Sequence, residues 1–378
     1  MKVALVHDYM REFGGAERVL RVLADIYPEA PIYVAFKIDK DSCAAQFRDR
    51  VVKESFLAPL IKYWNLYSPL RFLIPLIWWS MDLSKYDLVI TSCSSFVARG
   101  FRVGKKTKII AYCHTPPKFL YGYETSVNLQ RFLIVRIYAT IVNHFLRLFD
   151  FTSAQRVDKW IVNSKTVQQR VAKFYRKEAE IVYPPLEIDT LIDKSSKIQK
   201  DNYYLIVSRL VGSKGLEEAA LAAKHLKIKI KIAGESAGLS RVKQYITKVG
   251  GESLEFLGRV SEENLFQLYA GAKGFLALAR NEDFGMTVVE AQACGTPVIA
   301  YNGGGFRETV IDGKTGILIN STSVAEIEGA IKKLGKIKWK KEDLQTNAKK
   351  YDRINFEKKI RRIVAETIKK IVCLNYRK

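Results

Sequence analysis

Short apolar runs recur along the chain and are separated by stretches long enough to form helices. In the first half these runs cover residues 3–7, 32–36, 88–92, 109–112 and 160–163. In the second half they cover residues 203–207, 228–233, 254–257, 274–278, 297–300 and 316–319. Short apolar strands that alternate with helices are typical of parallel sheets covered on both faces, so the pattern predicts an α/β protein.

The two groups of predicted strands indicate two domains. With 378 residues, the chain is long enough for two α/β domains that each have their own core. Pro184 and Pro185, followed by a polar stretch, end the first group and stiffen the connection to the second. The predicted parts are Rossmann-like domains over residues 1–185 and 186–355, a last helix over residues 356–378, and a lysine-dense linker over residues 332–341. Ligands of such sheets bind at the carboxyl ends of the strands.

The segment NEDFGMTVVEAQACGTPVIA, residues 281–300, contains the clearest candidate chemistry. It places Glu282 and Glu290 eight positions apart, with Gly285 between them. The order of residues predicts a loop that carries Glu282 and a helix that opens near Gly285 and ends at Gly295. The first N–H groups of such a helix suit a phosphate, and a carboxylate in its second turn suits ribose hydroxyls. The predicted donor-binding residues of this nucleotide-sugar site are Phe284, Gly285, Met286, Thr287 and Glu290.

This segment resembles the donor-binding motif of the retaining family-4 glycosyltransferases, in which two glutamates flank seven residues. Residues 295–319, GTPVIAYNGGGFRETVIDGKTGILI, continue the resemblance without a gap. The resemblance implies the GT-B architecture, in which an acceptor-side and a donor-binding domain face each other across a cleft and the last helix crosses back to the first domain. It also implies that Glu282 lies at the transferred sugar and that Glu290 binds the ribose. An ordinary strand–helix–strand unit with two solvated glutamates is the alternative.

Two further loops carry residues suited to phosphate. Residues 208–215, SRLVGSKG, follow a predicted strand, so Arg209 and Lys214 are expected at the carboxyl edge of the second sheet. The resemblance implies that both bind the donor diphosphate and stabilise the departing nucleotide, whereas a generic basic loop is the alternative. Gly14 and Gly15 join the first strand to the first helix, where the family has a glycine-rich loop close to the diphosphate.

Residues 111–124, AYCHTPPKFLYGYE, form a second signature. His114 follows a predicted strand in a loop stiffened by two prolines, where it can bind a sugar hydroxyl or steady charge at the reacting carbon. The Cys-His-Thr-Pro context resembles a subset of the family in which many members use GDP-mannose for surface polysaccharides. The predicted acceptor-side residues are Asp8, Lys118 and Tyr121, although Asp8 is equally suited to capping the backbone.

The net charge of +23 indicates attraction to polyanions such as nucleic acid, an anionic membrane or phosphorylated substrates. A lysine-rich composition without functional meaning is the alternative. No aromatic-basic motif or recognition helix points to nucleic acid, so we predict no nucleic-acid partner. The five cysteines are odd in number and scattered, which favours a reducing compartment. Because the sequence also lacks a signal-peptide pattern, we expect a cytoplasmic protein.

Three segments could lie on a membrane or pack on a core. Residues 131–150 are apolar over most of a predicted helix, and residues 63–79 form a shorter apolar region. Residues 356–371 have an apolar face with basic residues outside it. A basic amphipathic helix can bind reversibly to anionic lipid or pack on a core with a solvated back. We favour core packing for the last helix, and both interpretations stay open for residues 63–79.

These features predict a retaining glycosyltransferase. It would move mannose from GDP-mannose to a lipid-diphosphate-linked or glycan acceptor in cell-surface glycan synthesis. The expected catalytic residues are Glu282, His114, Arg209 and Lys214. No Asp-x-Asp pair stands at the end of a predicted strand, so we expect neither a metal nor a cofactor, with positive side chains neutralising the diphosphate. The alternatives are a nucleotide-sugar epimerase of the same architecture and a basic nucleic-acid-binding protein.

Overall fold

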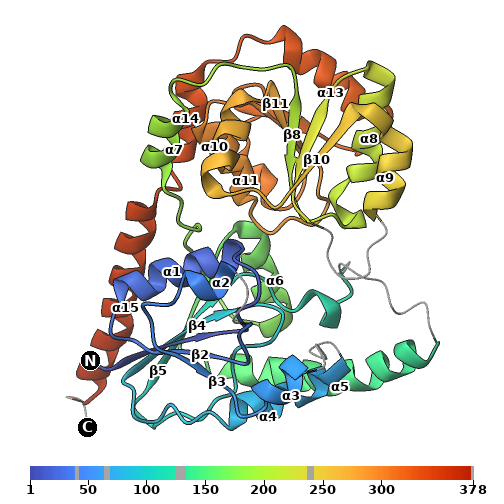
Figure 1. The fold of residues 1–378 in the computed structure, drawn as a ribbon. Helices are drawn as coiled ribbons and strands as arrows, with labels where there is room; N and C mark the ends of the chain where they lie inside the picture. The colour runs from blue at the N-terminus through green and yellow to red at the C-terminus, as the bar shows by residue number, and fades with distance from the viewer. Residues whose placement is uncertain (39–41, 64–68, 124–132, 236–241, 376–378) are drawn as a thin grey trace. The chain divides into compact units, whose positions relative to one another are not determined.

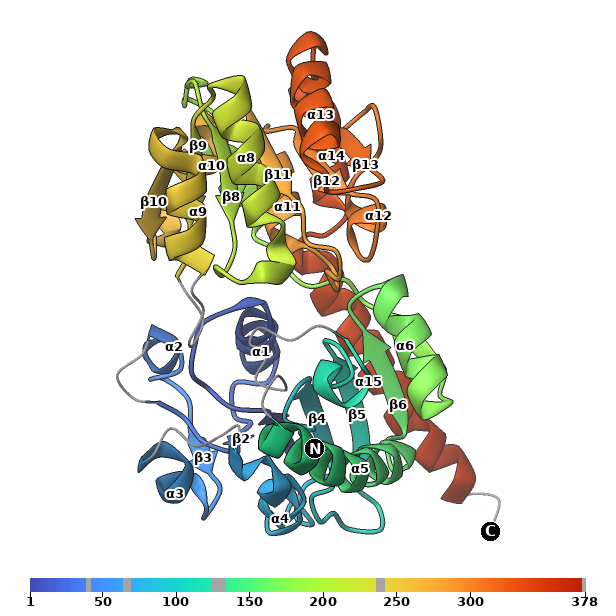
Figure 2. The same ribbon diagram turned by 90° about the vertical axis from the view of Figure 1, so that its right-hand side faces the viewer.

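The computed structural model of the chain describes residues 1–38, 42–63, 69–123, 133–235 and 242–375. These residues divide into two compact units. The first unit holds residues 1–123, residues 133–185 and the residues from 354 onward, and the second unit holds residues 186–353. In each unit, helices cover both faces of a parallel sheet (Figure 1, Figure 2).

The described part of the first unit forms a parallel sheet with the strand order β3-β2-β1-β4-β5-β6-β7. Its strands are β1 (Val3–His7), β2 (Ile32–Val34), β3 (Val52–Glu54), β4 (Leu88–Cys93), β5 (Lys108–Cys113), β6 (Lys159–Val162) and β7 (Ala179–Ile181). Its helices are α1 (Gly15–Ile26), α2 (Ser42–Ala45), α3 (Ala58–Tyr63), η1 (Pro69–Leu73), α4 (Ile74–Trp79), η2 (Lys118–Leu120), α5 (Leu133–Gln155), α6 (Lys165–Tyr175) and α15 (Arg353–Asn375). The strand order reverses between β1 and β4, which is the switch point where doubly wound sheets bind ligands.

The last helix, α15, packs on the first unit. Along β1, alternate side chains enter different cores, with Ala4 on one face of the sheet and Leu5 on the other. The apolar side chains Phe356, Ile360 and Ile363 of α15 are buried in the same core as Leu5. The prediction that this helix crosses back to the first domain and packs on its core is therefore confirmed.

The described part of the second unit forms a parallel sheet with the order β10-β9-β8-β11-β12-β13. Its strands are β8 (Tyr204–Val207), β9 (Ile230–Ala233), β10 (Leu254–Gly258), β11 (Gly274–Ala277), β12 (Val298–Tyr301) and β13 (Gly316–Ile319). Its helices are α7 (Ile188–Ser195), η4 (Gly212–Lys214), α8 (Leu216–Leu226), α9 (Val242–Gly250), η5 (Gly251–Ser253), α10 (Glu262–Gly271), α11 (Met286–Ala293), α12 (Phe306–Thr309), α13 (Val324–Lys336) and α14 (Lys341–Lys349). The switch point of this sheet lies between β8 and β11.

The two ends of the second unit lie side by side. Leu186 and Asp352 form a parallel β-bridge. The Leu186 N–H donates to the carbonyl oxygen of Tyr351 at 3.2 Å, and the Arg353 N–H donates to the carbonyl oxygen of Leu186 at 2.9 Å. The chain therefore enters and leaves this unit at one place.

Each strand predicted from the apolar runs is present, with boundaries within two residues at most ends. Two short strands, β3 and β7, were not predicted because each has only three residues, VKE and AEI, and includes charged side chains, so neither forms an apolar run. The predicted linker over residues 332–341 is confirmed only for residues 337–340, which connect α13 to α14, because its first residues complete α13. Ile331 and Leu334 continue the buried stripe of that helix, which explains why the lysines beside them do not end it.

Candidate active site

An ion pair marks the switch point of the second sheet. Lys214 lies in the loop after β8 and Glu282 in the loop after β11, and the Lys214 Nζ and Glu282 Oε2 atoms are 2.7 Å apart. Both side chains are about one quarter exposed, at 25% and 26%. Arg209, in the same loop as Lys214, is exposed. The structure thus brings the predicted catalytic residues Lys214 and Glu282 into contact. The third predicted catalytic residue of this sheet, Arg209, lies in the same loop as Lys214.

Glycines bring the two loops close to each other. Gly215 adopts a left-handed conformation with φ of 67°, and a Cβ atom there would lie 2.6 Å from the Cβ of Leu278. A Cβ atom on Gly304 would lie only 2.2 Å from the carbonyl oxygen of Glu282. That oxygen also accepts a hydrogen bond from the Gly305 N–H at 3.0 Å. The glycine run 303–305 therefore fixes the backbone that carries Glu282.

Helix α11 starts directly after Gly285, as the sequence predicted, and Met286 and Thr287 form its half-buried first turn. Phe284 is only 3% exposed, and its ring centroid lies 5.3 Å from that of Tyr351. The buried ring of Phe284 thus anchors the loop in the second unit. We infer that Phe284 contributes to donor binding by holding this loop in place. The start of α11 remains suited to a phosphate because its first N–H groups have no partner one turn earlier.

The side chain of Glu290 is held by Tyr269, a residue that the sequence analysis did not select. Glu290 is 4% exposed, and its Oε2 atom accepts a hydrogen bond from the Tyr269 hydroxyl at 2.8 Å. Burial, with the nearby charge of Glu290, raises the pKa of Cys294 to about 12. Behind them, Lys200 donates to the Thr296 hydroxyl, and burial lowers the pKa of Lys200 to about 8. Glu290 therefore has a fixed orientation before any ligand arrives.

A hydrogen-bonded chain runs across the switch point of the first sheet. His7 ends β1, Ser92 lies near the end of β4, and His114 directly follows β5. The Ser92 Oγ atom lies 3.0 Å from His7 Nδ1 and 2.7 Å from His114 Nε2. His7 Nδ1 is also 3.1 Å from the Ser92 carbonyl oxygen, which can only accept. We therefore assign the proton to His7 Nδ1, and the Ser92 hydroxyl can then donate to His114 Nε2.

The glycine loop belongs to this same chain. The Gly14 N–H donates to Glu17 Oε2 at 2.9 Å, and Glu17 Oε1 lies 3.4 Å from His7 Nε2. Burial disfavours the charged form of His7, but Glu17 and then Asp8 outweigh it and raise the His7 pKa. Gly15 begins α1. The sequence did not select Glu17 or Ser92, although both complete the link between the glycine loop and His114.

The surroundings of the two histidines shift their pKa values in opposite directions. Burial and the neighbouring His7 lower the pKa of His114 to about 3, so His114 is neutral at physiological pH. Its ring centroid lies 5.1 Å from that of Tyr112, and its carbonyl oxygen accepts from the Asn163 side chain at 3.0 Å. A neutral, firmly held imidazole can exchange hydrogen bonds with a hydroxyl group but cannot neutralise a phosphate.

Asp8 serves the backbone of a neighbouring loop. Its Oδ2 atom accepts from the Ser94 N–H, the Ser94 hydroxyl and the Phe96 N–H at 2.8–3.0 Å, and its Oδ1 atom accepts from the Ala98 N–H at 3.1 Å. Asp8 is only 3% exposed. Of the two roles expected for it, the structure shows the cap, and its acceptor-side role finds no support in this geometry.

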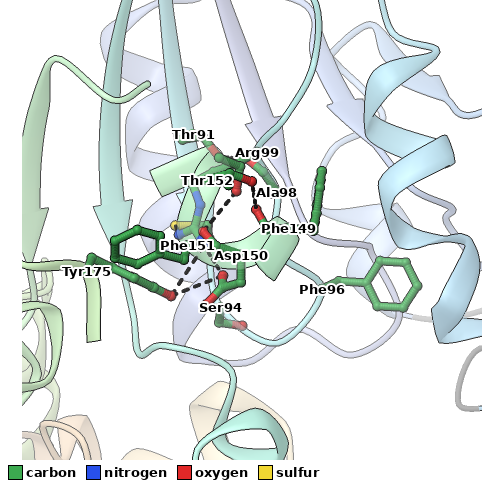
Figure 3. Close-up of polar contacts among 12 residues, drawn as sticks. Thr91, Ser94, Phe96, Ala98, Arg99, Phe149, Asp150, Phe151, Thr152 and Tyr175 are labelled. Atoms are coloured by element: carbon green, nitrogen blue, oxygen red, sulfur yellow. Dashed lines mark hydrogen bonds and ion pairs between the residues drawn. The ribbon is translucent and has the colours of Figure 1, made fainter. Parts of the chain in front are cut away.

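Tyr121 is likewise committed to structure. Its hydroxyl donates to Asp150 Oδ2 at 2.6 Å, and its ring stacks on Phe174 with centroids 4.0 Å apart. Asp150 also forms a buried ion pair with Arg99 and accepts from the Tyr175 hydroxyl at 3.2 Å, as Figure 3 shows. Tyr121 therefore supports this cluster, and its acceptor-side role stays a prediction. Lys118 is half-buried in η2, and its role stays a prediction.

The described residues contain no group of three or more histidine, cysteine, aspartate or glutamate side chains placed to hold a metal ion. The Asp-x-Asp pair of the sequence, Asp39 and Asp41, lies outside the described residues. Within the described helices, none is long and apolar enough to cross a membrane. The expected metal independence stays a prediction.

Two family models match the chain, one for each unit. The model described as Glycosyltransferase Family 4 matches residues 13–190, and the model described as Glycosyl transferases group 1 matches residues 187–351. The second match contains the Lys214–Glu282 pair and Glu290. The two doubly wound units have the GT-B fold, and the two matches, which together cover residues 13–351, support a glycosyltransferase.

Similar proteins agree with this classification. An uncharacterized glycosyltransferase of Methanocaldococcus jannaschii is 26% identical over 196 residues, which are 52% of this chain and 55% of that protein. The alpha-1,3/1,6-mannosyltransferase ALG2 of Dictyostelium discoideum is 26% identical over 66% of this chain and 67% of its own length. The matched part thus spans about half the length of the archaeal relative.

Among solved structures, Anabaena HepE in complex with UDP and glucose is similar with a TM-score of 0.68. It is 19% identical and covers 97% of this chain and 99% of its own. At this identity the likeness concerns the fold.

Proposed function

We propose that the chain is a retaining glycosyltransferase that moves a sugar from a nucleotide-sugar to a lipid-linked or polysaccharide acceptor. The observation that carries this proposal is the Lys214–Glu282 ion pair, 2.7 Å apart at the switch point of the second sheet. It puts a cation for a diphosphate and a carboxylate for sugar hydroxyls at one place. The family matches support the same reaction class.

In this proposal the leaving diphosphate is neutralised by side chains and helix ends. Arg209 can fork across two phosphate oxygens, and Lys214 contributes a point charge beside Glu282. The N–H groups at the start of α11 add a partial positive charge. Because the charge on the leaving group grows in the transition state, these groups stabilise the transition state more than the bound donor.

The two glutamates have separate parts. Glu290 binds the ribose hydroxyls with the carboxylate that Tyr269 orients, and Glu282 accepts hydrogen bonds from the transferred sugar. His114, neutral and bonded to Ser92, exchanges hydrogen bonds with a sugar hydroxyl. No metal or cofactor enters the proposed mechanism.

For the donor we propose GDP-mannose. The Cys-His-Thr-Pro signature at residues 113–116 and the likeness to an ALG2 mannosyltransferase support this choice. UDP-glucose is the second candidate, because a structure of similar fold was solved with UDP and glucose. We also propose that the protein works in the cytoplasm and binds reversibly to an anionic inner membrane face, where it meets a lipid-diphosphate acceptor. The net charge of +23 supports the binding to an anionic surface.

Thermal unfolding in the presence of a panel of nucleotide-sugars tests the donor. A ligand at about one hundred times its dissociation constant stabilises the native state by roughly 2.7 kcal/mol, so a true donor gives a clear shift. We expect GDP-mannose to stabilise more than UDP-sugars, and transfer to survive EDTA. A preference for UDP-glucose overturns the mannose assignment alone, and loss of transfer on chelation overturns the metal-free mechanism.

Product analysis separates this function from its rivals. Incubation with the donor and no acceptor should leave the nucleotide-sugar unchanged, whereas an epimerase would convert it to the epimer. A nucleic-acid-binding protein would show no stabilisation by any nucleotide-sugar and a steep fall of DNA affinity with salt. Either result contradicts the proposal.

A further inference from the structure

The side chains that helix α5 exposes to solvent are more apolar than the side chains that it buries in the first unit. The side chains that it buries in the first unit are Ala139, Asn143, Leu146, Asp150, Ser153 and Ala154, and Val142 and Phe149 pack partly against the same core. The side chains that it turns away, each between 52% and 82% exposed, are Ile134, Ile137, Ile141, Phe145 and Leu148. The exposed set recurs at intervals of three and four residues and therefore forms one stripe. A helix that only packs on a core has the opposite arrangement, so the stripe is built for a partner.

The stripe continues onto neighbouring helices. Helix α4 lies beside α5 in both views of the chain (Figure 1, Figure 2), and a shallow hollow of about 470 Å³ lies between them. Its walls include Leu76 and Trp79 from α4 and Phe149 from α5. Trp79 is 61% exposed, and Phe72, in η1 just before α4, is 50% exposed. Together these residues and the α5 stripe form what we term the α4–α5 surface.

The polar fringe of the α4–α5 surface is basic. Arg136, Arg147 and Arg156 are exposed on α5 or directly after it. The Arg102 guanidinium lies 5.6 Å from the Trp79 ring centroid and is partly neutralised by Asp82, 3.9 Å away. Residues 69–79 contain no acidic residue, and residues 133–155 contain only Asp150. That carboxylate is buried in the ion pair with Arg99 (Figure 3) and adds nothing to the surface.

We propose that the α4–α5 surface lies on an anionic lipid bilayer. Its apolar side chains enter the boundary between headgroups and acyl chains, Trp79 lies at the interface, and the arginines contact anionic headgroups. The charges favour lipid over a second copy of the chain, because two copies joined through this surface bring arginines together with no exposed carboxylate from α4 or α5 to pair with them. This inference does not rest on sugar transfer.

Flotation with vesicles tests the inference through a matched pair of variants. The stripe variant is Ile137→Ser, Ile141→Ser and Phe145→Ser, and the control variant is Val51→Ser, Tyr245→Ser and Ile311→Ser, which alters exposed apolar side chains elsewhere. On phosphatidylglycerol-containing vesicles we expect the stripe variant to bind at least about tenfold more weakly than the unaltered chain. The control variant should bind normally. Equal binding of both variants overturns the proposal.

Depth of insertion gives a second measurement. Brominated lipid should quench the fluorescence of Trp79. This quenching is measured as the difference between the unaltered chain and its Trp79→Phe variant. Equal quenching of the two proteins overturns the proposal. If the lipid-free chain forms a dimer that the stripe variant abolishes, the surface serves a second copy and the proposal is also overturned. Nucleotide-sugar binding by the stripe variant should be unchanged, so the outcome here is independent of the proposed reaction.

Discussion

The switch points of the two sheets share a topology but differ in charge. In the first unit, His7, Ser92 and His114 form a buried chain in which His114 is neutral. In the second unit, a partly exposed Lys214–Glu282 pair stands in the corresponding position, with Arg209 in the same loop. One topology therefore provides two places for ligands, while the side chains decide which ligand each can take.

The difference divides the proposed reaction between the units. A charged diphosphate needs cations, and those lie in the loops of the second unit. Neutral hydroxyl groups need firmly oriented hydrogen-bonding partners, which the first unit supplies through a buried histidine. Each of the following predictions tests this division of roles between the two units.

The largest effect is expected from the cations of the second unit. Arg209→Ala and Lys214→Ala should each lower turnover by about 10²–10³-fold, because each removes a group that stabilises growing charge on the diphosphate. Steady-state kinetics should show a larger loss in kcat than in donor affinity, and the double variant should lose less than the sum. Lys224→Ala, an exposed lysine of α8, is the control. Full activity in either single variant rules out the assignment.

The next effect concerns the ribose. Glu290→Ala should weaken donor binding by about 1.5–3 kcal/mol, because a carboxylate bonded to the ligand is lost. Calorimetric titration with the nucleotide measures it, and Glu263→Ala, an exposed glutamate of α10, is the control. If both variants bind the nucleotide equally well, Glu290 lies outside the site.

In the first unit, the comparison predicts a sensitivity to acid. The pKa of His114 is lowered to about 3, so below an unfolded value of about 6.5 the unfolded chain binds a proton that the native chain does not. The free energy of unfolding should fall by about 1.4 kcal/mol per pH unit in that window from this group alone. The raised pKa of His7 acts in the opposite sense, since its stabilisation is present below its unfolded pKa and is lost as pH rises through the folded one.

Urea unfolding at several pH values, compared between the chain and His114→Gln, isolates this contribution. The variant should lose less stability on acidification than the unaltered chain. His225→Gln is the control, because the His225 side chain is 58% exposed. An identical slope in His114→Gln and the unaltered chain contradicts the prediction.

The smallest effect is expected from the support of Glu290. Tyr269→Phe removes one hydrogen bond and should weaken nucleotide binding by about 0.5–1.5 kcal/mol. Because the hydroxyl acts by orienting the carboxylate that holds the ribose, the loss should shrink for a 2′-deoxynucleotide. Tyr245→Phe, on an exposed tyrosine, is the control. An equal loss for both nucleotides would make Tyr269 a purely structural residue.

Local patterns predicted much of the fold. The strand over residues 316–319 and the helix that opens after Gly285 are present as expected, because apolar periodicity and glycine placement are local signals. Strands β3 and β7 were not predicted because each is three residues long and contains charged side chains, which leave no apolar run. Lysines beside Leu334 suggested a linker where the helix continues, since exposed charge does not end a helix whose other face is buried.

The site was predictable where it depends on one loop and not where it depends on strand order. Lys214 and Glu282 were each expected in a loop that follows a strand of the second sheet, but the ion pair between them was not predicted. The bond from Ser92 to His114 required knowing that β4 lies between β1 and β5, which no local pattern reveals. The hydrogen bond from Tyr121 to Asp150 was likewise not predicted, because the two residues are 29 positions apart and only the fold brings them together.

The bridge between Leu186 and Asp352 has a consequence for how the molecule can be taken apart. Since both ends of residues 186–353 meet, that segment has the form of a domain inserted into a host chain whose final helix completes the host core. It can be excised as a separate polypeptide that retains Arg209, Lys214, Glu282 and Glu290. The first unit cannot be shortened in the same way, because a truncation before α15 would expose the core around Phe356 to solvent.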